Sequence, residues 1–199
     1  MADFDFARTQ ELLKGAALEP EPTWQAYHAQ AHDWTVTATL LAGPMIVITA
    51  ILVPILGWIF GTNMLPGIGG FIAQIILTLI MGLIGLAVSG AVFGLLAGSF
   101  GGNSSFDEGF AATSLAAVPA YAGQILGTLP WIGWLLAIAL GIYSLVLLYR
   151  CLPLFLGIPQ EKRIGHFVVG LIVLFVIYVI ISFPLAGLLM VGSGMPVAY

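Results

Sequence analysis

The charged residues of this chain are confined to three patches, and long uncharged stretches separate them. All five basic and nine acidic residues lie in residues 3–33, in the pair Asp107–Glu108 or in residues 150–163. A charge at the centre of a bilayer costs about 2.5–3.5 kcal/mol on insertion scales, so charged side chains collect at membrane surfaces. The patches therefore predict which parts of the chain reach the surface of a membrane.

The composition between the patches sets the fold class. Hydrophobic residues make up 60% of the chain and charged residues 7%. The uncharged stretches 34–106, 109–149 and 164–199 each exceed the roughly 20 residues that a spanning helix needs. Runs such as Leu171–Ile177 do not alternate as barrel strands do. We expect an all-α, polytopic membrane protein in contact with the lipid bilayer, and the lack of a basic stripe argues against nucleic-acid binding.

Two turn-forming sequences divide the uncharged stretches further. Residues 61–67 and residues 127–133 are rich in Gly and Pro, which is typical of turns. Together with the charged patches, these turns predict five transmembrane helices. The helices are expected at residues 35–60, 69–98, 106–127, 131–152 and 165–190.

The basic residues predict the orientation. All five lie in the N-terminal patch or in the loop before the last helix, and four expected spans separate these regions. Both regions therefore share one side, which the positive-inside rule makes cytoplasmic. We expect a cytoplasmic N-terminus and an outside C-terminus. No apolar segment precedes residue 35, so the first span is expected to act as its own insertion signal.

The chain divides into a tail, residues 1–33, and a transmembrane domain, residues 34–199. We expect a short helix at residues 11–18 of the tail, and Thr23 could cap a second helix. Aromatic residues then recur at spacings of three and four, which predicts an interfacial amphipathic helix that anchors the tail at the membrane surface. That helix face would carry Trp24, Tyr27, Ala31 and Trp34.

Small residues form a stripe on the second expected span. Gly90, Gly94 and Gly98 repeat at intervals of four residues. Small residues at this spacing let helix backbones approach closely in lipid. The stripe predicts either packing within one chain or contact with a second copy or another membrane protein, and the sequence leaves both open.

The loop at residues 101–110 carries the densest motif of the chain. Ser105 and Glu108 have the spacing of a capping box, in which each side chain bonds a backbone amide of the other. Asp107 and Glu108 also suit the positive end of a helix dipole. Alternatively, the two carboxylates could bind a cation or a partner. Arg150 is expected at the same depth and could pair with either one; together with Lys162 and Arg163, these residues form the candidate cytoplasmic interaction surface.

The remaining polar residues carry weaker predictions. His28 and His32 have the i, i+4 spacing of metal ligands, but we expect two solvated histidines near the membrane interface instead. His166 is expected at the surface. Gln74 and Gln124 could hydrogen-bond across helices. Prolines predict kinks at Pro44, Pro54, Pro119 and Pro184.

Several function classes lack support in the sequence. No ionisable residue lies in the middle of an expected span, where coupled transporters usually place one. No phosphate-binding loop, zinc-peptidase motif or nucleophile–base pair is present. We therefore expect a protein that is no enzyme and needs no cofactor. It would assemble with itself or other membrane proteins and organise or shape the bilayer; the alternative is a small transporter or channel between kinked helices.

The order of five motifs resembles the Yip1-domain family, in its bacterial branch. Pro22-Thr23-Trp24 precedes the first span, and Gly-Gly-x-x-Ser-Phe-x-Glu opens the third at residues 101–108. Val118-Pro-Ala-Tyr121 follows within the third span. The last two motifs lie at residues 142–153 and 157–162. Cys151 stands where this family usually has Gly.

The resemblance implies a five-span, non-enzymatic protein, here of a bacterial inner membrane. Eukaryotic relatives of this kind are linked to small GTPases, vesicle transport and membrane shaping. Their longer N-terminal region and Asp-Leu-Tyr-Gly-Pro signature do not occur in this sequence. Binding of small GTPases is therefore not expected here.

Overall fold

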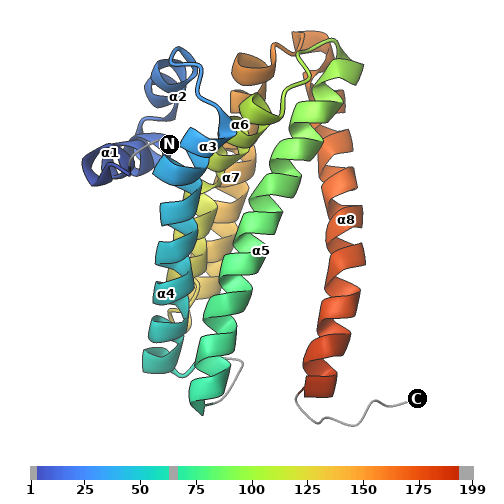
Figure 1. The fold of residues 1–199 in the computed structure, drawn as a ribbon. Helices are drawn as coiled ribbons and strands as arrows, with labels where there is room; N and C mark the ends of the chain where they lie inside the picture. The colour runs from blue at the N-terminus through green and yellow to red at the C-terminus, as the bar shows by residue number, and fades with distance from the viewer. Residues whose placement is uncertain (1–3, 63–66, 193–199) are drawn as a thin grey trace.

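Helices running along a common axis form the body of the molecule. The computed structural model describes residues 4–62 and 67–192, with side chains up to residue 181. No strand occurs in these residues, so the all-α prediction is confirmed. Successive helices run in opposite directions (Figure 1). They are α4 (Gly43–Phe60), α5 (Gly67–Leu96), α6 (Phe106–Leu126), α7 (Gly133–Leu156) and α8 (Arg163–Gly192).

Four of the described helical segments are long and apolar enough to cross a membrane. They are Trp34–Phe60, Gly67–Phe100, Gly133–Leu156 and Gln160–Ile181. The helix expected at residues 106–127 is present as α6, but α6 is not among the four. Its sequence mixes Ala, Ser and Thr with an acidic pair, so its hydropathy is lower. The protein is thus a polytopic membrane protein, and the fifth crossing stays a prediction.

Helix α6 forms the centre of the bundle. It packs against α4, α5 and α7, and most of its side chains are buried. Ala112 and Ala116 on α6 are almost fully buried, at 0% and 2% exposed. Small side chains bring the neighbouring backbones close and increase dispersion contact, which is the main source of helix association in lipid.

The first span begins with an irregular turn. Asp33 caps α3 (Trp34–Thr37), a π-helical turn η1 (Ala38–Ala42) follows, and α4 then begins with Pro44 in its first turn. Proline cannot donate to the carbonyl one turn earlier, so a regular helix would lose a bond here in any case. A Cβ on Gly43 would lie 2.7 Å from the carbonyl oxygen of Ala38, so the turn requires glycine.

Polar groups within the bundle only partly follow the predictions. Pro119 interrupts the hydrogen bonding of α6, and the next amide, Ala120 N, donates to Ser144 Oγ on α7 at 2.8 Å. Gln74 Oε1 is buried without a partner. No hydrogen bond joins Gln74 and Gln124 in the described residues, so that predicted cross-helix bond is not found. Pro184 lies beyond the described side chains.

The N-terminal segment folds back onto the bundle as two helices, α1 (Phe6–Leu18) and α2 (Pro20–His28). The helix expected at residues 11–18 is longer than predicted. Thr23 is not a cap: α2 begins three residues earlier, and the Thr23 hydroxyl donates to the Glu19 carbonyl at 2.8 Å. Proline suits the first helical position because its N–H would have no partner there. Pro20 therefore begins α2.

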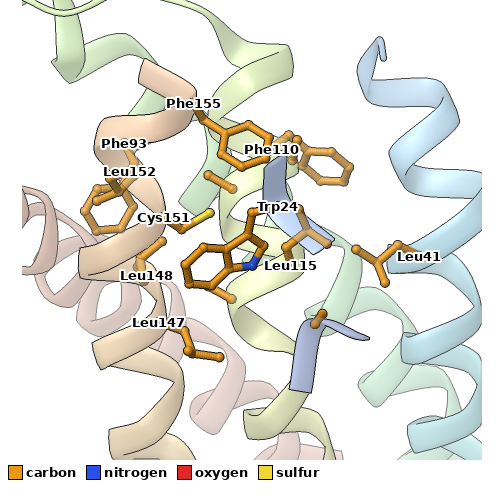
Figure 2. Close-up of a cluster of buried hydrophobic side chains, with 14 of the residues drawn as sticks. Trp24, Leu41, Phe93, Phe110, Leu115, Leu147, Leu148, Cys151, Leu152 and Phe155 are labelled. Carbon is orange, nitrogen blue, oxygen red and sulfur yellow. The ribbon is translucent and has the colours of Figure 1, made fainter. Parts of the chain in front are cut away.

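The largest apolar cluster lies at the end of the bundle that carries α1 and α2. Figure 2 shows Trp24 among side chains from α6 and α7. Trp24 and Tyr27 are each 2% exposed. The prediction that these two rings anchor the chain at the membrane surface is therefore wrong, because α2 turns them toward the bundle. Other members of this cluster are Leu41, Phe93, Phe110, Leu115, Leu147, Leu148, Cys151, Leu152 and Phe155.

Candidate interaction surface at the charged end

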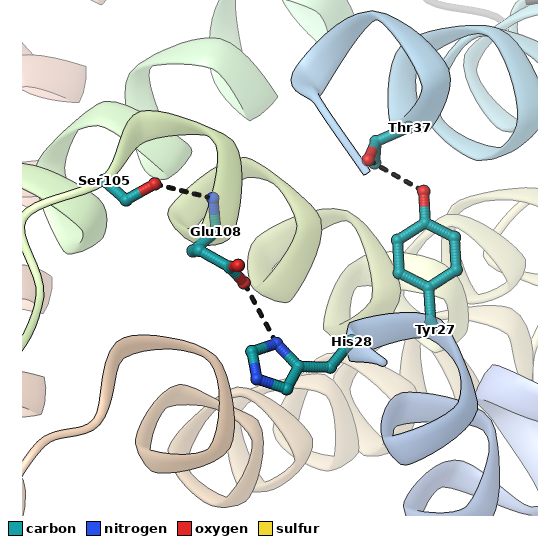
Figure 3. A network of polar contacts seen from close by, with 5 residues as sticks. All are labelled: Tyr27, His28, Thr37, Ser105 and Glu108. Atoms are coloured by element: carbon teal, nitrogen blue, oxygen red, sulfur yellow. Dashed lines mark hydrogen bonds and ion pairs between the residues drawn. The ribbon is translucent and has the colours of Figure 1, made fainter. Parts of the chain in front are cut away.

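The polar residues at the beginning of α6 contact the N-terminal segment. Ser105 Oγ accepts from Glu108 N at 3.3 Å, which is one half of the predicted capping box. The Glu108 carboxylate does not return this bond. Its Oε2 instead lies 3.2 Å from His28 Nδ1 at the end of α2 (Figure 3). Glu108 thereby connects α6 to α2.

Asp107 makes the second connection. Its Oδ1 accepts from the backbone N of Trp34 at 3.0 Å. Asp33, one residue earlier, accepts from Val36 N at 3.0 Å and from the Thr35 hydroxyl at 2.7 Å. These two donors hold the pKa of the Asp33 carboxyl below its usual value. Two carboxylates therefore bond the free backbone amides where the first span begins.

Arg150 pairs with Glu21 of α2, through Nη2 and Oε1. The predicted pairing of Arg150 with Asp107 or Glu108 is wrong, because residues of the N-terminal segment occupy those carboxylates. The Arg150 and Glu21 side chains are 50% and 58% exposed. An exposed pair of this kind contributes about 0–1 kcal/mol. It orients α2 more than it stabilises the fold.

Lys162 and Arg163 contact a different part of this end. Lys162 belongs to a short 3-10 turn, η3 (Gln160–Lys162), and lies near Gly101. The Arg163 guanidinium stands 5.6 Å from the centre of the Tyr149 ring, a cation–π distance. The five predicted surface residues thus form two groups. Asp107, Glu108 and Arg150 contact the N-terminal segment, whereas Lys162 lies near Gly101 and Arg163 contacts Tyr149 of α7.

A buried hydrogen bond also joins the N-terminal segment to the beginning of the first span. Tyr27 and Thr37 share a hydrogen bond of 2.8 Å between their hydroxyl groups (Figure 3). Burial raises the pKa of the Tyr27 phenol, although the Thr37 bond opposes the change. The bond joins α2 to α3 directly. Together with the Glu108 contact, it fixes α2 against the first span and α6.

The two histidines of the proposed metal pair have separate partners. His28 contacts Glu108, whereas His32 Nε2 lies 3.0 Å from Arg8 Nη2 and 3.0 Å from Gln30 Oε1. Burial and the nearby Arg8 charge lower the pKa of His32. In residues 4–62 and 67–192, no three His, Cys, Asp or Glu side chains are grouped as metal ligands.

The glycine stripe, which continues from α5 into the following 3-10 turn, lies against α6 and the loop before it in the same chain. A Cβ on Gly90 would be 2.7 Å from the Cα of Phe110, and one on Gly94 would meet the Ser105 carbonyl. Gly109 on α6 faces them, and a Cβ there would be 2.6 Å from the Cα of Gly94. A Cβ on Gly98 would meet Ser104 at 3.3 Å.

His166 is buried, although the sequence predicts a surface position for it. The residue is 0% exposed, and its Nε2 lies 2.9 Å from the Phe93 carbonyl oxygen. The rings of Phe93 and Phe100 flank it at centroid distances of 5.7 and 5.4 Å. Its place beside Lys162 and Arg163 suggested the surface, and no sequence motif signals this contact between α5 and α8.

These features define an α-helical integral membrane protein whose charged segments gather at one end of the bundle. Residues 14–191 match the family model of the Yip1 domain, so the chain belongs to the Yip1 domain family. Proteins of this family are generally non-enzymatic membrane proteins. Searches of curated proteins and of solved structures found no match.

Proposed function

We propose that this protein is a non-enzymatic, five-span protein of a bacterial inner membrane that assembles laterally with a second copy or with other membrane proteins. Through that assembly it organises or shapes the bilayer. The supporting observation is the exposure of two of its longest helices. In the most apolar 18-residue stretch of each segment, only 6% is buried in Gly67–Phe100 and 11% in Gln160–Ile181, whereas 50% is buried in Trp34–Phe60.

A groove between α5 and α8 is the best candidate for the assembly face. It has a volume of about 160 Å³, and its lining is almost entirely apolar. Gly85 and Ser89 lie in it at a spacing of four residues, and a Cβ on Gly85 would meet nothing within 4 Å. Small residues at this spacing suit the close approach of a partner helix. Gly90 and Gly94, by contrast, already lie against α6.

The contacts at the charged end support the proposed topology. Glu21 with Arg150, and His28 with Glu108, join the three charged patches. Patches in contact share one side of the membrane, as five spans require. The positive-inside rule then favours a cytoplasmic N-terminus.

Replacing Gly85 with Leu tests the assembly face. The wild-type protein in native-lipid nanodiscs is expected to show a defined multimer by mass photometry, and Gly85→Leu should shift it toward the monomer because the side chain fills the groove. Gly141→Leu is the matched control, since Gly141 on α7 also has open space at its Cβ position. A monomeric wild type, or equal mass distributions for all three proteins, would contradict the proposal.

A small transporter or channel is the alternative. A hollow of about 320 Å³ between α5 and α6 favours it, because its lining includes the polar side chains Thr78, Tyr121 and Gln124. Affinity purification from the native membrane separates the two functions. Stable co-purifying membrane proteins would support assembly, whereas solute flux through reconstituted monomers would support transport.

A further inference from the structure

Two hydrogen bonds set the depth of α1 along the bundle. Thr9 Oγ1 donates to the Leu40 carbonyl at 2.8 Å, and Tyr143 Oη donates to the Ala17 carbonyl at 3.2 Å. Leu40 lies six residues into the first span from Trp34, and Tyr143 lies seven residues before Arg150. At 1.5 Å per residue, both ends of α1 lie about 10 Å inward from the charged end.

That depth corresponds to the boundary between headgroups and acyl chains. The headgroup layers add roughly 5–8 Å to each side of the hydrocarbon core, and interfacial helices lie about 5–10 Å deep. Figure 1 shows α1 running across the bundle axis beside the beginning of the first span. Phe6 and Leu18 at its two ends are each 69% exposed, as membrane-facing side chains would be.

A pocket lies between the beginning of α1 and the first span at this level. It has a volume of about 830 Å³ and combines apolar side chains with Asp5, Arg8 and His32. The apolar members come from both elements, so the pocket offers a surface to acyl chains next to polar groups. They are Phe4, Phe6, Ala7, Val36 and Leu40.

The charges of the pocket suit a zwitterionic headgroup. Arg8 uses only Nη2 in its side-chain bonds to Gln30 and His32, so in the described structure Nε and Nη1 remain to donate. Burial and the Arg8 charge lower the pKa of His32, which favours the neutral ring, so Arg8 is the main cation of the pocket. The Asp5 carboxylate accepts from Arg8 N at 3.1 Å and places a negative charge beside it.

We propose that this pocket binds a phospholipid of the surrounding bilayer that carries a primary ammonium group. Arg8 binds the phosphodiester, Asp5 attracts the ammonium, and the apolar side chains of the pocket contact the acyl chains. A headgroup without an ammonium, such as that of phosphatidylglycerol, is disfavoured because its net negative charge would lie beside the Asp5 carboxylate with no cation to offset it. The inference requires only that the bundle lies in a bilayer, and it is independent of lateral assembly.

Native mass spectrometry of the full chain tests the site. The protein in detergent is titrated with phosphatidylethanolamine, phosphatidylcholine or phosphatidylglycerol, and the lipid-bound fraction is measured. Wild type should bind phosphatidylethanolamine most strongly. Arg8→Gln should weaken binding of all three lipids about tenfold, whereas Asp5→Asn should reverse the preference between phosphatidylethanolamine and phosphatidylglycerol. Asn also caps helices well, so Asp5→Asn should preserve α1.

Lys14→Gln is the matched control, because Lys14 lies on α1 but outside this pocket. Equal losses from Arg8→Gln and Lys14→Gln would reduce the effect to general charge attraction and overturn the proposal. Displacement of the lipid by millimolar inorganic phosphate would overturn it too, since the site would then bind phosphate alone. Phe6→Ser offers a second route: it leaves Arg8 in place and should still weaken lipid binding at least threefold.

Discussion

At the residue scale, Asp33 stabilises the beginning of the first span. Its carboxylate accepts from Val36 N and from the Thr35 hydroxyl, so the folded pKa lies below the usual value. The contribution to stability is therefore complete above the unfolded pKa and is lost as the pH falls through the folded pKa. Asp33→Ala should lower the melting temperature in detergent at pH 7 by roughly 2–4 °C.

Asp33→Asn separates the cap from its charge. Asparagine also accepts from a backbone amide, so this variant should melt close to wild type at pH 7. On acidification, wild type should lose melting temperature relative to Asp33→Asn, because Asp33 takes up a proton and Asn does not titrate. Indistinguishable melting of the Ala and Asn variants at pH 7 would contradict a capping role.

At the element scale, the crossing of α5 and α6 requires glycine on both helices. A Cβ on Gly109 would be 2.7 Å from the backbone N of Gly94, and backbone atoms cannot turn aside as a side-chain end can. Gly109→Ala should therefore destabilise the protein by about 1–3 kcal/mol, the range for an overpacked site. Chemical denaturation in detergent micelles measures this change.

Gly141→Ala provides the comparison for that crossing. No atom lies within 4 Å of its Cβ position, so alanine should be neutral or stabilising by up to about 1 kcal/mol through helix propensity. A comparable loss in both variants would mean that glycine matters for flexibility of the bundle and not for close approach at the α5–α6 crossing.

The sequence predicts the long helices well because their limits are local. Ser105 and the turn after Gly127 define the ends of α6, which begins at Phe106 and ends at Leu126. The contacts of the N-terminal segment depend on tertiary folding, and no local pattern encodes them. Glu21 was therefore missed as the partner of Arg150, and Trp24 was expected at the membrane surface.

At the scale of the whole molecule, polar side chains at one end of the bundle join the three charged patches, which are far apart in the sequence. Helix α2 contributes Glu21, Tyr27 and His28 to these contacts. Deep in the bundle, association depends mainly on small residues and apolar packing. A soluble partner would therefore find its polar contacts at the charged end, whereas membrane partners would meet α5 and α8.

The topology of the whole chain can be tested with single cysteines at four exposed positions. Five crossings place the turns after α4 and α6 outside and the turns after α5 and α7 inside, because α6 then spans the membrane. An impermeant thiol reagent on intact cells should label Thr62→Cys and Trp131→Cys, whereas Asn103→Cys and Gln160→Cys should react only after permeabilisation.

The native Cys151 is buried and serves as the unlabelled background. Trp131 is 95% exposed, so its failure to react would reflect topology and not burial. If Thr62→Cys reacts from outside and Trp131→Cys does not, α6 fails to cross and the five-span topology is wrong.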